Sequence, residues 1–203
     1  GTPIWQARQM CPQLNVVPAR PRLYVEFHHR LVNAVENCVH VSQVLSIDEM
    51  WCELSGAISR RERAEMLARE IKAAIAREVG AYLKCSIGIA PNVFLAKTAT
   101  ELQKPDGLIV IEPDDLPHCL HVLPLRDLCG IGSRMEKRLR ANGITTTEGL
   151  CRASRHLLRY VWGSVEGDRF YENLRGEWLV RPPTKRGSIS HSHVLPPHLR
   201  NEA

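Results

Sequence analysis

Aromatic residues are scarce in this 203-residue chain, where Phe, Trp and Tyr together make up 5%. Any contact with nucleic acid would therefore rest on phosphates more than on base stacking. Long hydrophobic runs are also missing, and stretches such as Leu108 to Ile111 are far too short to span a bilayer. Nothing near the start resembles a secretory signal. We therefore expect a soluble protein without a membrane partner.

The seven cysteines show no CxxC spacing, and their number is odd. This pattern argues against a disulfide framework or a cysteine-based zinc site and favours a reducing, cytoplasmic location. Only His118, Cys119 and His121 approach the spacing of metal ligands, and we interpret them as a polar loop beside an apolar segment.

Composition and charge indicate a globular chain with one basic part. Apolar residues make up 44% and charged residues 24%, which excludes wholesale disorder, collagen and coiled coil. Residues 1–112 hold 13 Lys and Arg against 12 Asp and Glu, whereas residues 126–186 hold 13 against 7. This asymmetry indicates an anionic partner for the C-terminal part, although a solvated basic face would look the same.

The order of expected elements indicates an α+β fold. Helical spacing begins at Leu23, and strands are expected at 39–45 and 50–54, close enough to form a hairpin. A helix follows a capping box at 59–62 and ends at a left-handed Gly80. A strand at 83–89, a helix capped by Asn92 and a strand at 108–111 complete a sheet covered by helices. After Pro113 the pattern predicts only short helices, which form a small second domain.

Asp48 and Glu49 lie at the tip of the expected hairpin. At a tip the backbone turns, so that both carboxylates can converge on one cation. Mg²⁺ prefers oxygen ligands and often uses one or two carboxylates together with phosphates, as two-metal phosphoryl transfer requires. An exposed acidic turn is the alternative interpretation of the same dipeptide.

A glycine loop opens a basic helix in the second domain and is typical of a helix-hairpin-helix unit. Two glycines let the backbone turn tightly and approach a ligand, and free N–H groups at the helix start can face a phosphate. Such a unit would hold a DNA backbone without reading bases, unless it is a plain turn between helices. A weaker second copy includes Gly163 and Gly167. The candidate DNA-binding residues are Gly130, Ile131, Gly132, Ser133, Arg134, Lys137, Gly163 and Gly167.

Several motifs in this order resemble the Y-family translesion DNA polymerases of the DinB/UmuC (impB/mucB/samB) type. Residues 46–49 are similar to the family's SIDE palm motif. The segments at 86–92, 94–97 and 104–107 resemble its SIGIAPN, FLAK and KPNG signature. Residues 123–132 resemble its thumb helix-hairpin-helix, residues 1–7 the end of its fingers, and residues 187–190 the start of its connector to the little finger.

The resemblance implies a palm-like sheet covered by helices and a helical thumb. Residues 1–22 would be a remnant of the fingers, 23–112 a partial palm, 113–183 the thumb and 184–203 the connector. Asp48 and Glu49 would be catalytic Mg²⁺ ligands, and Lys104 would contact the triphosphate of an incoming dNTP. The implied partners are primer-template DNA, the dNTP and, through segments outside this chain, a sliding clamp.

The family's first palm strand, with a further metal-binding Asp, has no counterpart here, nor do most of the fingers and the little finger. We therefore expect a palm–thumb fragment that binds DNA and extends primers poorly by itself. A catalytically inactive, polymerase-like module that binds DNA is the alternative. An unrelated helix-hairpin-helix repair protein would explain residues 124–180 and leave the first 112 unexplained.

Overall fold

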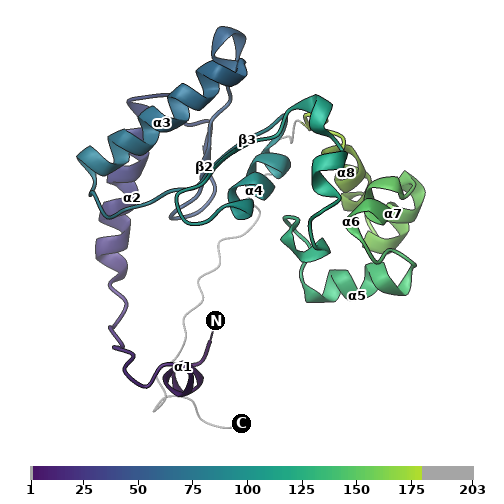
Figure 1. The fold of residues 1–203 in the computed structure, drawn as a ribbon, viewed down its shortest axis with the longest axis horizontal. Coiled ribbons are helices and arrows are strands. Elements are labelled where there is room, and N and C mark those ends of the chain that lie inside the picture. The colour runs from purple at the N-terminus through teal and green to yellow at the C-terminus, as the bar shows by residue number, and fades with distance from the viewer. Residues whose placement is uncertain (1, 180–203) are drawn as a thin grey trace, which may run out of the picture.

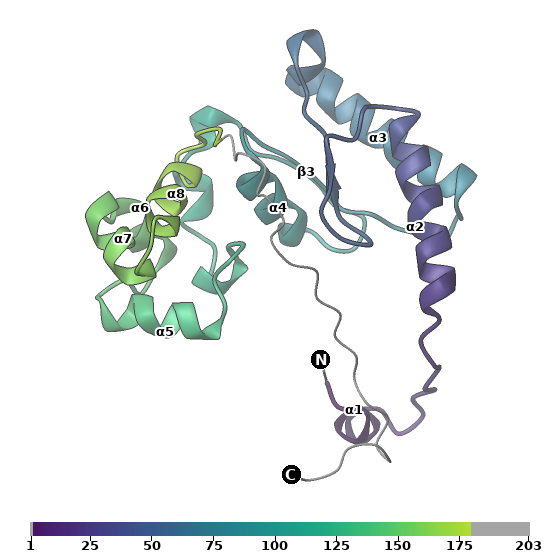
Figure 2. The ribbon, with the colours of Figure 1, turned by 180° about the vertical axis from the view of Figure 1, so that it is seen from behind.

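The computed structural model describes residues 2–179, which form helices and short strands of an α+β fold (Figures 1 and 2). This confirms the fold class expected from the sequence. Residues 180–203, including the expected connector at 184–203, lie outside the described residues. Within residues 2–179, no helix combines the length and apolar character needed to cross a bilayer.

Two helices open the chain. Helix α1 (Ile4–Met10) buries none of its residues and lies away from the other helices in both views (Figures 1 and 2). Helix α2 (Pro21–Glu36) begins with the proline that the sequence indicated, since a fixed φ suits the first helical position. Only Ala34 and Val35 of α2 are buried, close to its C-terminal end.

A short hairpin and a long helix follow α2. Strand β1 (Gln43–Val44) pairs antiparallel with β2 (Met50–Trp51). Both strands are shorter than the segments 39–45 and 50–54 expected from the sequence. Helix α3 (Arg61–Glu78), after the 3₁₀ turn η1 (Gly56–Ser59), packs on α2 in a buried cluster with Ile75 and Val79. The capping box prediction is wrong, because the hydroxyl of Ser59 donates to the carbonyl of Gly56 instead.

Gly80 also differs from its prediction, since it does not lie in the left-handed region. Its N–H donates to the carbonyl oxygen of Ile75 at 3.1 Å, which closes the last turn of α3 without a change in helical hand. Glycine is therefore not required there by backbone conformation.

The next unit is a parallel strand pair joined by a helix. Strands β3 (Ile87–Ile89) and β4 (Leu108–Val110) pair in parallel, with Ile87 opposite Leu108, and α4 (Val93–Leu102) connects them. A Cβ on Gly88 would lie 2.0 Å from the carbonyl oxygen of Ala96, so glycine permits the close approach of β3 to α4. The described strands form two separate two-stranded sheets, not the single sheet that was expected.

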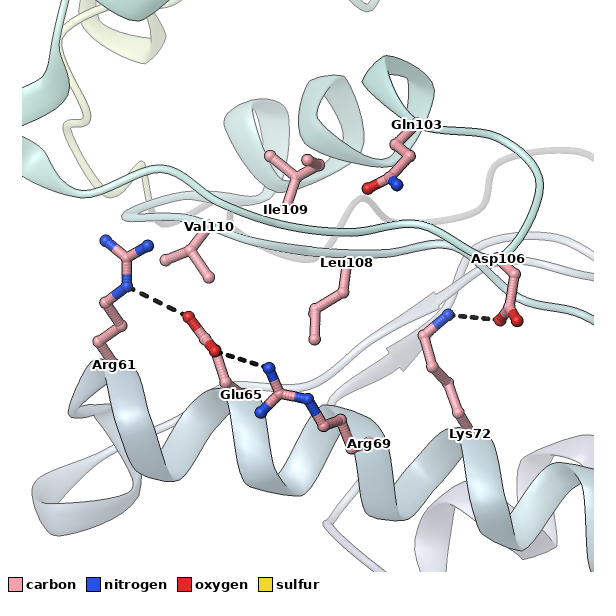
Figure 3. Close-up of a pocket in the computed structure, with 9 residues that line it drawn as sticks. All are labelled: Arg61, Glu65, Arg69, Lys72, Gln103, Asp106, Leu108, Ile109 and Val110. Carbon is pink, nitrogen blue, oxygen red and sulfur yellow. Dashed lines mark hydrogen bonds and ion pairs between the residues drawn. The ribbon is translucent and has the colours of Figure 1, made fainter.

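Ion pairs lie along the side of α3 that faces β4 (Figure 3). Glu65 receives hydrogen bonds from Arg61 at 3.2 Å and from Arg69 at 2.9 Å, and Lys72 lies 2.7 Å from Asp106. These groups border an open cavity of about 480 Å³ between α3 and β4. Each exposed pair contributes little stability, and of these three pairs only Lys72–Asp106 joins α3 to the turn before β4.

The helical part, residues 113–179, gathers at one side of the molecule (Figure 1). Helices α5 (Ser133–Ala141), α6 (Thr147–Arg152), α7 (Arg155–Trp162) and α8 (Glu166–Asn173) follow three 3₁₀ turns. Those turns are η2 (Pro113–Asp115), η3 (His118–Leu120) and η4 (Leu125–Asp127). Leu95 and Ala99 of α4 belong to the same buried cluster as Leu120, Leu139 and Leu158, so the core is continuous across the boundary expected near 112–117.

The segment after α8 turns back toward the strands. The side-chain amide of Asn92 donates to the carbonyl oxygens of Asn173 at 3.0 Å and of Glu177 at 3.1 Å. The rings of Trp51 and Trp178 meet edge to face, with centroids 5.5 Å apart. Both contacts join the hairpin and α4 to the end of the helical part.

Candidate functional site

The hairpin tip presents Asp48 and Glu49 on a closed turn. The N–H of Leu45 donates to the carbonyl oxygen of Glu49 at 2.8 Å, which closes the tip. The hydroxyl of Ser46 donates to Oδ1 of Asp48 at 2.7 Å and fixes that carboxylate. Asp48 is exposed and Glu49 is half-buried, so both carboxylates can reach a ligand.

The tip is also attached to the helix behind it. The ring of His28 on α2 donates from Nδ1 to the carbonyl oxygen of Ile47 at 2.8 Å. The two acidic residues therefore stand on a loop that is anchored at its base by strand pairing and at its tip by a helix.

Lys97 on α4 connects this tip to the parallel unit. Its Nζ lies 2.6 Å from Oε1 of Glu49 and 2.8 Å from Oε1 of Glu101. Partial burial by itself lowers the pKa of Lys97, but the hydrogen bonds to both carboxylates outweigh it, so the pKa is raised overall. Lys97 therefore carries its positive charge throughout the physiological range.

Lys104 lies at the other end of the same charge network. Its Nζ is 2.6 Å from Oε2 of Glu101, and its side chain is 55% exposed. The ammonium groups of Lys104 and Lys97 hold the pKa of Glu101 below its ordinary value. The order Glu49, Lys97, Glu101, Lys104 thus alternates negative and positive groups from the hairpin tip to the residue expected to meet a triphosphate.

The first glycine loop has the geometry that the sequence indicated at its two glycines. Gly130 adopts a φ of +85°, which favours glycine, and Gly132 is the N-cap of α5 with no heavy atom within 4 Å of a Cβ placed there. Ile131 is only 4% exposed and anchors the loop in the core, so it does not face a ligand by its side chain. The N–H groups of Gly132 and Ser133 are left at an open helix start.

Arg134 and Lys137 extend from α5 beside that loop. Both are exposed, and among the described residues no carboxylate lies within ion-pair distance of either. By contrast, Arg140 is paired with Glu136 at 2.9 Å. Two unpaired cations beside a helix start form a surface suited to phosphate groups.

The second glycine pair lies in different surroundings. Gly163 ends α7 with a φ of +69°, and Gly167 lies buried in α8, where a Cβ would be 2.3 Å from the carbonyl oxygen of Leu158. Glu166 and Asp168 occupy the first turn of α8, which disfavours an anion there. The structure therefore favours helix packing over the phosphate contact suggested for these two glycines.

A cavity of about 580 Å³ lies between the glycine loop and α4. Lys97 and Glu101 line one side of it, and the other side is formed by residues 126–132. Lys97 and Glu101 of the charge network and the glycine loop at 130–132 therefore line the same cavity, although they lie far apart in sequence.

The residues at the tip suit a magnesium ion. Carboxylate oxygens are the ligands that Mg²⁺ prefers, and the ammonium of Lys97 already occupies a cation position against Glu49. Within residues 2–179, no group of three His, Cys, Asp or Glu side chains is close enough to hold a metal ion. An ion held here would therefore need phosphate oxygens, water or a further carboxylate to complete its coordination.

Sequence reasoning missed Glu101, and it included Lys97 only in the motif at 94–97 without giving it a role. Lys97 and Glu101 are four residues apart on one helix, and Glu101 and Lys104 three apart, which is the spacing of side-chain pairs. That spacing is the signal that could have shown the helical half of the network. The pair between Lys97 and Glu49 joins residues 48 positions apart, so no spacing in the sequence indicates it.

Comparison with known proteins identifies the same regions. The family model of the impB/mucB/samB family matches residues 1–101, and that of the IMS family HHH motif matches residues 113–144. The DNA polymerase IV of Moorella thermoacetica is 38% identical over 146 residues, which covers 72% of this chain and 36% of that protein. The DNA polymerase IV of Legionella pneumophila is 34% identical over 203 residues, which covers 98% of this chain and 56% of that protein.

A solved structure described as an insertion ternary complex of Dbh DNA polymerase superposes with a TM-score of 0.76 at 30% identity. The match covers 86% of this chain and 50% of that one. The chain thus spans between about a third and a little over half of the length of these relatives.

Proposed function

The chain belongs to the impB/mucB/samB family, and from this premise we propose that it supplies the palm and thumb of a Y-family polymerase that copies damaged DNA. In this proposal residues 1–22 end the fingers, 23–112 form the palm, 113–183 the thumb and 184–203 a connector. The observation that carries the proposal is the single opening shared by the Glu49 network and the glycine loop.

The acidic pair has the chemistry for the catalytic half of that task. Asp48 and Glu49 would hold Mg²⁺, which activates the primer 3′-hydroxyl and neutralises charge on the phosphates. The hydroxyl oxygen would attack the α-phosphorus of a dNTP paired with the template, and pyrophosphate would leave. Lys104, which is exposed beside Glu101, would meet the triphosphate as a point charge.

The glycine loop has the chemistry for holding the duplex. Backbone N–H groups at Gly130 to Ser133 would donate to DNA phosphates, with Arg134 and Lys137 beside them. Such contacts fix the position of the DNA without reading its sequence. The similarity to a Dbh DNA polymerase solved as an insertion ternary complex supports such a role. Activity in a cytoplasmic setting, as the cysteines indicate, belongs to the same proposal.

Binding of primer-template DNA by the 203-residue chain tests this function. We expect fluorescence anisotropy to show an affinity that falls with salt by about 0.9 log units per log unit for each phosphate contacted. Adding Mg²⁺ and the dNTP that matches the template should tighten binding, and a mismatched dNTP should not. Asp48→Ala should remove that response and leave DNA binding intact.

The alternative, a module that binds DNA without catalysis, predicts a different result. It is favoured by the finding that the described residues offer two carboxylates at the tip and no third metal-binding side chain nearby. DNA binding that ignores both Mg²⁺ and the identity of the dNTP would support it. An affinity that does not change with salt would contradict both functions. Strong primer extension by this chain, lost in Asp48→Ala, would show that no further carboxylate is needed.

A further inference from the structure

Lys97 stands between two carboxylates and against the residue proposed to hold a metal ion. Its ammonium is 2.6 Å from Oε1 of Glu49 and 2.8 Å from Oε1 of Glu101, and its side chain is 30% exposed. Because α4 is fixed by β3 on one side and by the core on the other, this ammonium is held near the hairpin tip.

A divalent cation at the tip must therefore share Glu49 with a positive group already bound to it. Two cations on one carboxylate repel each other, so metal binding and the Lys97–Glu49 pair oppose each other. Lys97 has a second carboxylate within hydrogen-bond distance, so it can release Glu49 without losing every ionic partner.

We propose that Lys97 is a positioning residue that competes with a metal ion for Glu49: it neutralises this carboxylate before a metal ion binds, and it keeps only its pair with Glu101 when one does. The inference rests on the proposed function, because it takes Glu49 to be a metal ligand. Lys97 touches neither reacting atoms nor substrate in this role, and acts through the carboxylate that it holds.

Glu101 already holds both ammonium groups, with Lys97 at 2.8 Å from Oε1 and Lys104 at 2.6 Å from Oε2. Each lysine therefore has its own carboxylate oxygen, and Lys97 can lose Glu49 without displacing Lys104.

The test is a titration of the full 203-residue chain with Mn²⁺, in which the electron paramagnetic resonance signal of the free ion is monitored. It measures whether Lys97 competes with a metal ion for Glu49. We expect Lys97→Gln to bind Mn²⁺ about two- to fivefold more tightly than the wild type, the range given by loss of one partly exposed ion pair. Lys97→Arg keeps the charge and should return the affinity toward the wild-type value. Far-ultraviolet circular dichroism confirms that each variant is folded.

The matched control is Lys84→Gln. Lys84 pairs with Asp106 at 3.8 Å and is absent from the Glu49 network, so this variant makes the same change in net charge away from the tip. In a Glu49→Gln background, Lys97→Gln should not raise the Mn²⁺ affinity, because residue 49 is already neutral. If Lys97→Gln and Lys84→Gln raise the Mn²⁺ affinity equally, competition by Lys97 is refuted, although the acidic pair can still be the metal site.

Failure of the proposed function has a separate signature. If Asp48→Asn and Glu49→Gln both bind Mn²⁺ as the wild type does, the acidic pair is not a metal site. The proposed role of Lys97 is then refuted as well. If those variants weaken binding and Lys97→Gln weakens it too, the metal site is supported. Lys97 then supports Glu49 and does not compete for it, and the proposal is wrong.

Discussion

Asn92 shows how much one side chain can join. It is 4% exposed, and its Oδ1 accepts the N–H of Leu95 at 2.8 Å. Its amide donates to the carbonyls of Asn173, the last residue of α8, and of Glu177. The cap could be predicted from sequence, because asparagine before an apolar helical run is a common N-cap. The other two bonds could not, since Asn173 and Glu177 lie 81 and 85 residues away.

Asn92→Ala should therefore cost more than a cap. Loss of an N-cap costs about 1 kcal/mol, and loss of the two part-buried hydrogen bonds to the carbonyls of Asn173 and Glu177 adds about 1–3 kcal/mol. We expect a total of about 2–4 kcal/mol in the free energy of unfolding, measured by urea denaturation. Ser154→Ala is the control, because Ser154 only caps α7. Equal losses for both variants would show that the bonds to the helical part contribute nothing.

Asp106 predicts a pH dependence at the same scale. A hydrogen bond from Lys72, with Lys84 nearby, holds the pKa of this carboxyl below its usual value of 3.8. The folded state thus binds its proton less readily than the unfolded state, so the ion pair stabilises the fold above about pH 3.8 and is lost as pH falls below it.

Asp106→Asn should then unfold at lower urea than the wild type at pH 7, and the gap should close toward pH 3. Asparagine suits this position because Asp106 has a φ of +63°, which asparagine tolerates. The variant therefore removes the charge and keeps the turn. A gap that stays constant with pH would mean that the charge of Asp106 plays no part.

At the scale of the elements, the glycine loop contains a glycine that the fold does not require and that a ligand could use. Gly132 has a φ of −85°, which any residue adopts, and a Cβ there meets no atom within 4 Å. Gly88 is the opposite case, because its Cβ would strike the backbone of α4. Both glycines stand in motifs, and only the structure distinguishes the one that permits packing from the one that leaves room for a ligand.

Gly132→Ala should leave the urea midpoint nearly unchanged and weaken DNA binding. A methyl group at the open helix start would stand between the backbone N–H groups and a phosphate, and loss of one such charge-assisted hydrogen bond corresponds to about 10-fold in affinity. Anisotropy with primer-template DNA measures it. Gly143→Ala, in the turn after α5, controls for strain, since Gly143 has a φ of +80° and should lose stability without a specific loss of binding. Unchanged DNA affinity in Gly132→Ala would remove the loop from the interface.

Across the whole molecule, the buried clusters do not follow the boundary that the sequence indicated. Proline and acidic residues near 112–117 do mark the end of the strands. Yet α4 shares its core with α5 to α8, while α2, α3 and the hairpin form another cluster. Composition reveals where the chain changes character. It does not reveal which helix faces are buried together, because that depends on the crossing of elements far apart in sequence.

Leu95→Ala tests this division. Leu95 is fully buried in α4, and its truncation should cost about 2–5 kcal/mol. We expect faster amide hydrogen exchange in both α4 and α7, with α2 and α3 less affected. Ile75→Ala, in the other cluster, should show the reverse distribution. Exchange that accelerates in α4 alone would mean that its core is not shared with the helical part.

The contact between Trp51 and Trp178 gives the molecule an optical signal of its own. Two indole rings with centroids 5.5 Å apart and an interplanar angle of 66° couple their electronic transitions. One ring sits on the hairpin that carries the acidic pair, and the other follows the helices that carry the glycine loop. Near-ultraviolet circular dichroism of the unlabelled chain can therefore report any movement of one against the other as DNA is added.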